Sequence, residues 1–217
     1  MKVSVIITAG GVGKRMGAGM PKQFITLKGK PILIYTIERF VAVLPDAQFL
    51  LTLPEDYIEE GQQLLQSYQL NNVQVLAGGV ERFDSIKNAL VHCTGDVIAV
   101  HDGVRPFVSA ETILNLIKTA ETSQCAIPFM VVNDSMRKLE GDNSKIVARK
   151  DYVTVQTPQC FDAQILKEAY EQEYSEVFTD DASVVEQLGY TIQLVPGNAE
   201  NIKITTPFDL KVAELFI

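Results

Sequence analysis

A glycine-rich turn near the start of the chain has the composition of a phosphate-binding loop. Residues 8–16 read Thr-Ala-Gly-Gly-Val-Gly-Lys-Arg-Met and directly follow an apolar run. Glycines let the backbone approach a phosphate closely and point its N–H groups at the oxygens, while Lys14 and Arg15 add positive charge. A tight turn without a ligand is the alternative, and the two adjacent cations weigh against it. The predicted substrate-binding residues of this turn are Ala9, Gly10, Gly11, Gly13 and Lys14.

Two familiar glycine-rich motifs are excluded by their spacing. The P-loop requires a glycine five positions before Gly13 and a serine or threonine after Lys14, but this chain has Thr8 and Arg15 there. The dinucleotide-binding fingerprint requires a third glycine where this chain has Met16, and no acidic residue lies near the expected ribose-binding spacing. A dehydrogenase that transfers hydride is therefore a remote alternative.

Two more residues could complete a polyphosphate site. Lys22 follows Pro21, which fixes the backbone so that this lysine can fold back towards the glycine-rich turn; alone it would be an ordinary solvated lysine. Asp102 ends a β-rich run, at the strand end where ligands gather in open α/β sheets. It is the natural carboxylate for a magnesium ion that bridges a triphosphate, although a turn or capping aspartate is the plain alternative. His101 is interpreted as a structural residue rather than a base.

The composition limits the class of protein. The 217 residues carry a net charge of −8, whereas a nucleic-acid binder would need a basic face. The apolar runs are too short to cross a bilayer, and the N-terminus lacks the zones of a signal peptide, so we expect no membrane partner and a cytoplasmic protein. Cys93, Cys125 and Cys160 are widely spaced and are predicted to be reduced thiols in or near the core.

The elements that must position these residues alternate along the chain. Segments rich in β-branched residues are separated by amphipathic stretches, which predicts an α/β fold with a mostly parallel, helix-covered sheet. No repeat, low-complexity tract or linker divides the sequence, so one domain spanning residues 1–217 is expected. The predicted strands are Val3–Thr8, Phe49–Pro54, Val73–Ala77, Val97–His101 and Ala126–Val132. The predicted helical faces are Ile86, Ala89, Leu90 and Cys93, then Ile113, Leu116, Ile117 and Ala120.

Local signals place several boundaries. Pro31 suits the first turn of one helix, Ser109 is a good N-cap for another, and Thr206 followed by Pro207 begins the last helix. Residues 201–205 alternate as a strand would, with Lys203 on the solvent side.

The segment from Ser135 to Gln156 departs from this pattern. Residues 136–139 and 145–148 are short alternating pieces around Glu-Gly-Asp-Asn, which is a hairpin-turn composition. An antiparallel arm at about 135–155 would expose edge groups that a second copy of the chain could cover, so a homodimer is predicted.

At this point a family resemblance can be read from several motifs in order. Ala9-Gly10-Gly11-x-Gly13-x-Arg15-Met16, followed by Pro21-Lys22-Gln23, resembles the 2-C-methyl-D-erythritol 4-phosphate cytidylyltransferase family of isoprenoid biosynthesis. The resemblance extends through the whole chain. The further matching segments are residues 78–85, 101–106, 134–136, 157–159, 179–183 and 201–205.

The resemblance implies a three-layer, Rossmann-like nucleotidyltransferase fold and a defined reaction. A phosphate oxygen of a polyol-phosphate acceptor would attack the α-phosphorus of CTP, and pyrophosphate would leave without a covalent enzyme intermediate. Arg15 and Lys22 match the family's transition-state stabilisers, which fits the need for fixed positive charge around a crowded phosphorus. Arg149 and Lys203 match residues that hold the acceptor phosphate for in-line attack.

The remaining matches concern nucleotide and acceptor contacts. Gly79, Val80 and Ser85 would approach the cytosine, and Gly103 with Arg105 would lie near the nucleotide and acceptor. Ser135 stands where a threonine is common and keeps a hydroxyl for the acceptor. The other positions carried over as substrate-binding are Arg82, Asp102, Thr157 and Thr179.

Two other functions stay open at the level of sequence. Ribitol-5-phosphate cytidylyltransferase shares several of these motifs and the same chemistry, and residues 134–137 and 197–203 favour methylerythritol phosphate only weakly. A non-catalytic nucleotide-binding protein could keep the fold. The presence of Arg15, Lys22 and Asp102 together with both acceptor-binding cations argues against that function.

Overall fold

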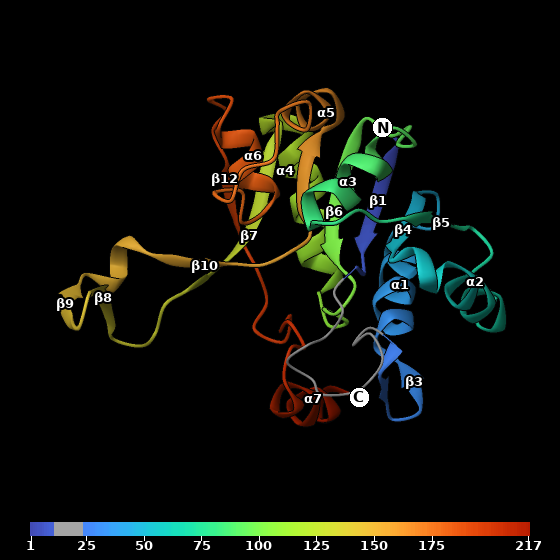
Figure 1. Cartoon of the computed structure of the whole chain (residues 1–217), viewed down its shortest axis with the longest axis horizontal. Helices are drawn as coiled ribbons and strands as arrows, with labels where there is room; N and C mark the ends of the chain where they lie inside the picture. The colour runs from blue at the N-terminus through green and yellow to red at the C-terminus, as the bar shows by residue number, and fades with distance from the viewer. Residues whose placement is uncertain (11–23) are drawn as a thin grey trace.

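Four neighbouring parallel strands form one half of a large mixed sheet. The computed structural model describes residues 1–10 and 24–217, and the sheet order is β10-β7-β11-β6-β1-β4-β5, with β12 paired to β7 (Figure 1). The four parallel strands are β1 (Val3–Thr8), β4 (Gln48–Leu53), β5 (Val73–Ala77) and β6 (Val97–Asp102), all paired in parallel. β5 lies at the edge of the sheet and is partly exposed. The three inner strands β1, β4 and β6 are covered on both faces, so they read as largely continuous apolar runs.

The other half of the sheet is mixed in direction. β11 (Gln159–Asp162) lies antiparallel between β6 and β7 (Cys125–Val131). β10 (Val153–Val155) pairs antiparallel with β7, and β12 (Gln193–Pro196) pairs parallel with it. The sequence predicted β7 but not β10, β11 or β12. The mostly parallel sheet is confirmed.

Helices cover both faces of the sheet and give three layers. Alternate β1 residues point to opposite sides, since Val5 and Ile7 join one buried cluster and Ile6 joins the other. The predicted helical faces, including Ile86 and Ile113, are buried. The first cluster includes side chains of α1 (Ile32–Val43), α2 (Ile58–Ser67) and α4 (Ala110–Ser123), and the second includes those of α3 (Arg82–Leu90), α5 (Ala163–Ala169) and α6 (Asp181–Glu186).

The predicted helix starts are also confirmed. Ser109 caps α4 by accepting a hydrogen bond from the Thr112 backbone N–H at 3.0 Å. Thr206 caps α7 (Pro207–Ala213) in the same manner, with proline in the first turn. Pro31 stands at the cap position of α1 and belongs to a small hairpin of β2 (Thr26–Leu27) and β3 (Lys30–Pro31). Short 3₁₀ turns cover Glu55–Tyr57, Arg149–Asp151 and Glu214–Phe216.

A separate hairpin projects from the body of the molecule as the sequence predicted. β8 (Met136–Glu140) and β9 (Asn143–Val147) pair only with each other among the described residues, and the hairpin stands clear of the main sheet (Figure 1). Gly141 turns the chain with φ of 60°, a left-handed conformation that glycine adopts without strain. Leu139 and Ile146 are 79% and 77% exposed on this arm.

The prediction of a strand at residues 201–205 is wrong. This segment has no ladder partner in the described part of the chain, and its groups instead bond to loops. The Asn201 side chain donates to the Thr157 carbonyl at 2.8 Å, and the Ile204 N–H donates to the Val104 carbonyl at 3.0 Å. The alternation therefore reflects packing on the turn that follows β6 rather than pairing in a sheet.

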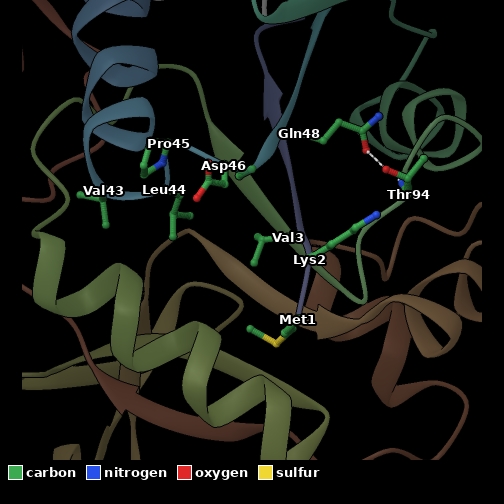
Figure 2. A pocket seen from close by; sticks show the side chains of 10 residues that line it. Met1, Lys2, Val3, Val43, Leu44, Pro45, Asp46, Gln48 and Thr94 are labelled. Atoms are coloured by element: carbon green, nitrogen blue, oxygen red, sulfur yellow. Dashed lines mark hydrogen bonds between the residues drawn. The ribbon is translucent and has the colours of Figure 1, made fainter.

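One pocket lies at the amino ends of β1 and β4, away from Asp102 at the carboxyl end of β6. It measures about 460 Å³, and apolar side chains such as Val3, Val43 and Leu44 line much of it (Figure 2). Its polar residue Gln48 is already bonded to Thr94 and to the His92 carbonyl. Among residues 1–10 and 24–217, every helix is too short or too polar to span a bilayer.

Candidate functional site

The carboxyl ends of the parallel strands meet at one edge of the sheet. Thr8 pairs with both Asp102 and Thr52, and Leu53 pairs with Ala77, so four strands end at the same level. Ligands in open α/β sheets bind at this edge, because the loops that leave the strands open into a crevice there. Six of the described candidate residues lie in these loops: Ala9, Gly10, Gly79, Val80, Gly103 and Arg105.

Asp102 is the centre of a cluster of cations. Its carboxylate lies 3.1 Å from the Arg105 Nε and 3.1 Å from the Lys203 Nζ. The Arg82 Nε lies 3.6 Å from its other oxygen. These four residues come from β6, the turn after it, the start of α3 and the 201–205 segment, and the sequence predicted all four as site residues. The fold thus brings together residues that are about a hundred positions apart in sequence.

This cluster has an excess of positive charge. Burial alone would raise the pKa of Asp102, but the charges of Arg82, Lys203 and Arg105 outweigh it and hold that pKa well below its usual range. Asp102 is therefore ionised at any physiological pH. Together with Asp181, which pairs with Arg82, two carboxylates face three cations, and the Lys203 side chain is still 43% exposed. An anionic ligand would find unneutralised charge here.

Behind Asp102, a buried hydrogen-bonded chain fixes the strand end. Burial lowers the pKa of His101 to about 4, so the ring is neutral and carries one proton. The Arg105 carbonyl lies 3.0 Å from the His101 Nε2 and can only accept, so the proton is on Nε2. The His101 Nδ1 therefore accepts from the Thr157 hydroxyl at 3.0 Å, and the Thr157 Oγ1 accepts from the Asp102 N–H at 3.1 Å. The predicted structural role of His101 agrees with this arrangement.

The turn between β5 and α3 lies beside the start of the glycine-rich turn. The Gly79 N–H donates to the Ser85 Oγ at 3.0 Å, and a Cβ built on Gly10 would lie 3.6 Å from that oxygen. A Cβ on Gly79 would lie only 2.2 Å from the Asp84 Cβ, so this position requires glycine. Val80 is 93% exposed. Of the three residues predicted to approach the cytosine, Ser85 thus lies beside Gly10, and Gly79 is bonded to Ser85.

Gly103 allows two strand ends to approach closely. Its N–H donates to the Thr8 carbonyl at 2.9 Å, and a Cβ there would lie 3.2 Å from the Ala9 Cβ. Ala9 is buried and Gly10 is exposed, so the chain reaches the surface just where the glycine-rich turn begins. The predicted residues Gly11, Gly13, Lys14, Arg15 and Lys22 lie outside the described residues.

Three other predicted residues are exposed and form no ion pair or hydrogen bond with Asp102 among the described residues. Thr179 is exposed and lines a small cavity of about 80 Å³ together with Arg82. Ser135 is exposed just before the arm. Arg149 is exposed just after β9 and donates to the Asn133 carbonyl. In the described part of the chain, no ion pair connects Arg149 to the Asp102 cluster.

Two buried residues of the site were not predicted individually. Asp181 forms a bidentate pair with Arg82, at 2.9 and 2.7 Å, and was included in the matched segment 179–183 without a role. Asn201 accepts a hydrogen bond from the Arg105 Nη1 through its carbonyl at 2.9 Å, which ties the Lys203 segment to the turn after β6. Their residue types alone carry no signal, because their partners are distant in sequence.

The described residues fit a metal ion that is held mainly by a substrate. Residues 1–10 and 24–217 contain no group of three or more His, Cys, Asp or Glu side chains that could bind a metal by themselves. Magnesium commonly takes one or two protein carboxylates and completes its shell with phosphate oxygens and water. Asp102 is a permanently ionised carboxylate at the strand edge and can supply one such ligand.

Comparison with known proteins gives the family. A sequence model described as 2-C-methyl-D-erythritol 4-phosphate cytidylyltransferase matches residues 3–217. A protein of that name from Phocaeicola vulgatus is 49% identical over 219 residues, covering 100% of both chains. The crystal structure of the enzyme of that name from Thermus thermophilus aligns with a TM-score of 0.79 at 31% identity, covering 100% of this chain and 98% of that one.

A second solved structure agrees with this fold. The 4-diphosphocytidyl-2C-methyl-D-erythritol synthase from Anaerococcus prevotii aligns with a TM-score of 0.85 at 27% identity, covering 99% of this chain and 95% of that one. The match thus extends over the cation cluster, the glycine-rich turn and the arm alike. This chain belongs to the 2-C-methyl-D-erythritol 4-phosphate cytidylyltransferase family.

Proposed function

We propose that the chain transfers the CMP part of CTP to 2-C-methyl-D-erythritol 4-phosphate, giving 4-diphosphocytidyl-2-C-methyl-D-erythritol and pyrophosphate in the non-mevalonate route to isoprenoid precursors. The observation that carries the proposal is the cation cluster around Asp102, at the strand edge where a triphosphate would bind. The family and the names of its full-length relatives favour this acceptor over ribitol 5-phosphate.

The reaction needs charge and positioning rather than proton transfer. A bond forms between an acceptor phosphate oxygen and the α-phosphorus of CTP, and the bond from that phosphorus to the pyrophosphate oxygen breaks. The attacking phosphate is already an anion, so no base has to remove a proton, which agrees with a neutral and fully bonded His101. Arg15 and Lys22 are assigned to stabilise the transition state and the leaving pyrophosphate.

The Asp102 cluster orients the residues that receive the substrates. Lys203 is partly exposed and held at 3.1 Å from Asp102, so its ammonium group is fixed while it can still meet a phosphate. Arg105 is held between Asp102 and the Asn201 carbonyl, which leaves it little freedom. We assign Lys203 to the acceptor phosphate and Arg105 to the nucleotide side of the crevice.

Enzymes of this kind are nucleotidyltransferases, which generally depend on a metal ion. We propose that the ion is magnesium, with Asp102 as its protein ligand. When bound, it would neutralise charge on the triphosphate and so favour departure of pyrophosphate. Because Asp102 stays ionised at low pH, its ability to bind a cation does not depend on pH in the physiological range.

The arm supports a homodimer. Leu139 and Ile146 lie on the same face of the hairpin, because Ile146 pairs with Arg137, which is two residues from Leu139 on β8. Arg137 and Ser144 share this face and bond to each other. Leu139 and Ile146 are both largely exposed, and a partner surface would stabilise these two apolar side chains by covering them. Arg149 follows this hairpin, so we place its guanidinium over the acceptor site of the partner protomer.

We further propose one domain over residues 1–217 and a cytoplasmic enzyme without nucleic-acid partners. The three cysteines of the chain are buried free thiols, which suits a reducing compartment. The net charge of −8 disfavours binding to a phosphate backbone.

Replacement of Lys203 tests the site. We expect Lys203→Ala to lower kcat/KM for the acceptor about a hundredfold, because a positioned cation is lost, while the affinity for CTP changes much less. Lys211→Ala is the matched control, since Lys211 is an exposed lysine on α7, and it should behave as the wild type. An unchanged acceptor KM and kcat in Lys203→Ala would remove Lys203 from the site.

A further inference from the structure

The buried carboxylate of Asp181 lies against Arg82 and has no role in the reaction proposed above. Asp181 is the first residue of α6 and has no exposed surface. Both its oxygens accept hydrogen bonds from the Arg82 guanidinium, at 2.9 and 2.7 Å. The Tyr170 hydroxyl, at the end of α5, donates to the same carboxylate at 2.6 Å. The carboxylate is therefore fully engaged, and its geometry is set by two other elements.

The Arg82 guanidinium lies between two carboxylates. Its Nη atoms face Asp181, and its Nε lies 3.6 Å from the Asp102 oxygen that Arg105 and Lys203 leave free. A bidentate pair fixes the plane of an arginine, because two parallel N–H bonds allow only one orientation. Because Asp181 holds both Nη atoms of Arg82, it also determines where the Arg82 Nε lies relative to Asp102.

The anchor itself is rigid. Gln159, in β11, donates to the Asp180 carboxylate at 2.8 Å and accepts from the Ala182 N–H at 2.9 Å, so α6 begins at a defined place on the sheet. Phe83 stacks on the Tyr170 ring with centroids 4.6 Å apart, which links α3 to α5 beside the pair. The Arg82 side chain is 32% exposed, so one part of it still faces the crevice.

We propose that Asp181 is a positioning residue of the nucleotide site: it holds Arg82 in the orientation that serves CTP and Asp102, with Tyr170 as its support. Asp181 does not touch the substrate and acts only through Arg82. This inference rests on the assignment of Arg82 to the substrate site. Residues that orient a ligand-binding group in this way commonly change activity by tenfold to a hundredfold when replaced.

A double-mutant cycle on kcat/KM for CTP tests the proposal. We expect Asp181→Asn to lower kcat/KM at least about tenfold in the wild-type background, because asparagine cannot form the charged bidentate pair. In the Arg82→Gln background the same replacement should change kcat/KM by less than about twofold, since the residue through which it acts is gone. Glu38→Gln is the matched control, because it removes a surface ion pair with Lys30 at 2.7 Å and should leave kcat/KM unchanged.

Asp181→Asn leaves Arg82 without its charged partner, and this loss could prevent the variant from folding. In that case Tyr170→Phe tests the same proposal. This variant retains both charges and removes only the hydroxyl, so we expect a loss of about threefold in the wild-type background and none in Arg82→Gln. Equal losses in both backgrounds, for either replacement, would overturn the proposal and give Asp181 a purely structural role. A normal kcat/KM for CTP in Arg82→Gln alone would instead show that the assignment of Arg82 is wrong, and the inference would fail with it.

Discussion

At the scale of single residues, His101 connects the site to the stability of the fold. Its pKa of about 4 lies below the ordinary value of 6.5, because the ring is buried. Between these two values the unfolded chain binds a proton that the folded chain does not, so stability falls as the pH is lowered from 6.5 towards 4. The full loss is no more than about 3 to 4 kcal/mol, for a pKa that is lowered from 6.5 to about 4 at ~1.4 kcal/mol per pKa unit.

This dependence can be measured by urea unfolding across pH. We expect the unfolding free energy of the wild type to fall from pH 6.5 to pH 4, and that of His101→Gln to be flatter although lower at pH 7.5. His92→Gln is the control, because His92 is exposed and its variant should keep the slope. The contribution of Asp102 to the unfolding free energy falls in a different pH range. The ordinary pKa of this carboxyl is 3.8 and its pKa in the fold is lower, so the stabilisation is lost only near and below pH 3.8. An identical slope in His101→Gln would show that another group titrates in this range.

The sequence predicted Arg82, Asp102, Arg105 and Lys203 as site residues, and the fold brings these four side chains together. Their roles in the reaction stay predictions. Their contacts could not be predicted, because ion pairs between segments that are distant in sequence leave no local pattern. Asp181 has no distinguishing signal either. Its burial and its two partners exist only once α3, α5 and α6 pack on the sheet.

At the scale of elements, apolar periodicity located the long segments. β1 and β5 begin and end where predicted, and β4, β6 and β7 do so within one residue, because buried parallel strands are continuous apolar runs. The short strands β10, β11 and β12 were missed, since three or four residues of mixed polarity carry little pattern. Residues 201–205 were wrongly predicted to be a strand. Their polarity alternates as in a strand, but the segment packs on loops instead of pairing in a sheet.

The turn between β5 and α3 gives a test at this scale. We expect Gly79→Ala to lower kcat/KM for CTP at least about tenfold, because a Cβ would meet the Asp84 Cβ at 2.2 Å and displace the N–H that bonds to Ser85. Gly189→Ala serves as control. Its φ of 88° makes alanine strained there, but the site is open, so stability should fall by about 1 kcal/mol with unchanged kinetics. Normal CTP kinetics in Gly79→Ala would show that this turn does not contact the nucleotide.

At the scale of the whole molecule, the arm predicts the oligomeric state. We expect the wild type to sediment as a dimer and the double variant Leu139→Ser, Ile146→Ser to shift to monomer with lower activity, because the two exposed apolar side chains of the hairpin are lost. Lys138→Ser, on the opposite face, should stay dimeric. A wild-type monomer with full activity would contradict both the dimer and the placement of Arg149 at a partner's site.

The measurement that tests the account most directly compares acceptors. Pyrophosphate release from CTP with magnesium should be followed at equal concentrations of 2-C-methyl-D-erythritol 4-phosphate and of ribitol 5-phosphate. We expect kcat/KM to be at least about a hundredfold higher for methylerythritol phosphate, since binding energy at the reacting centre depends on a matched acceptor. A preference for ribitol 5-phosphate, or no release with either acceptor, would contradict the account.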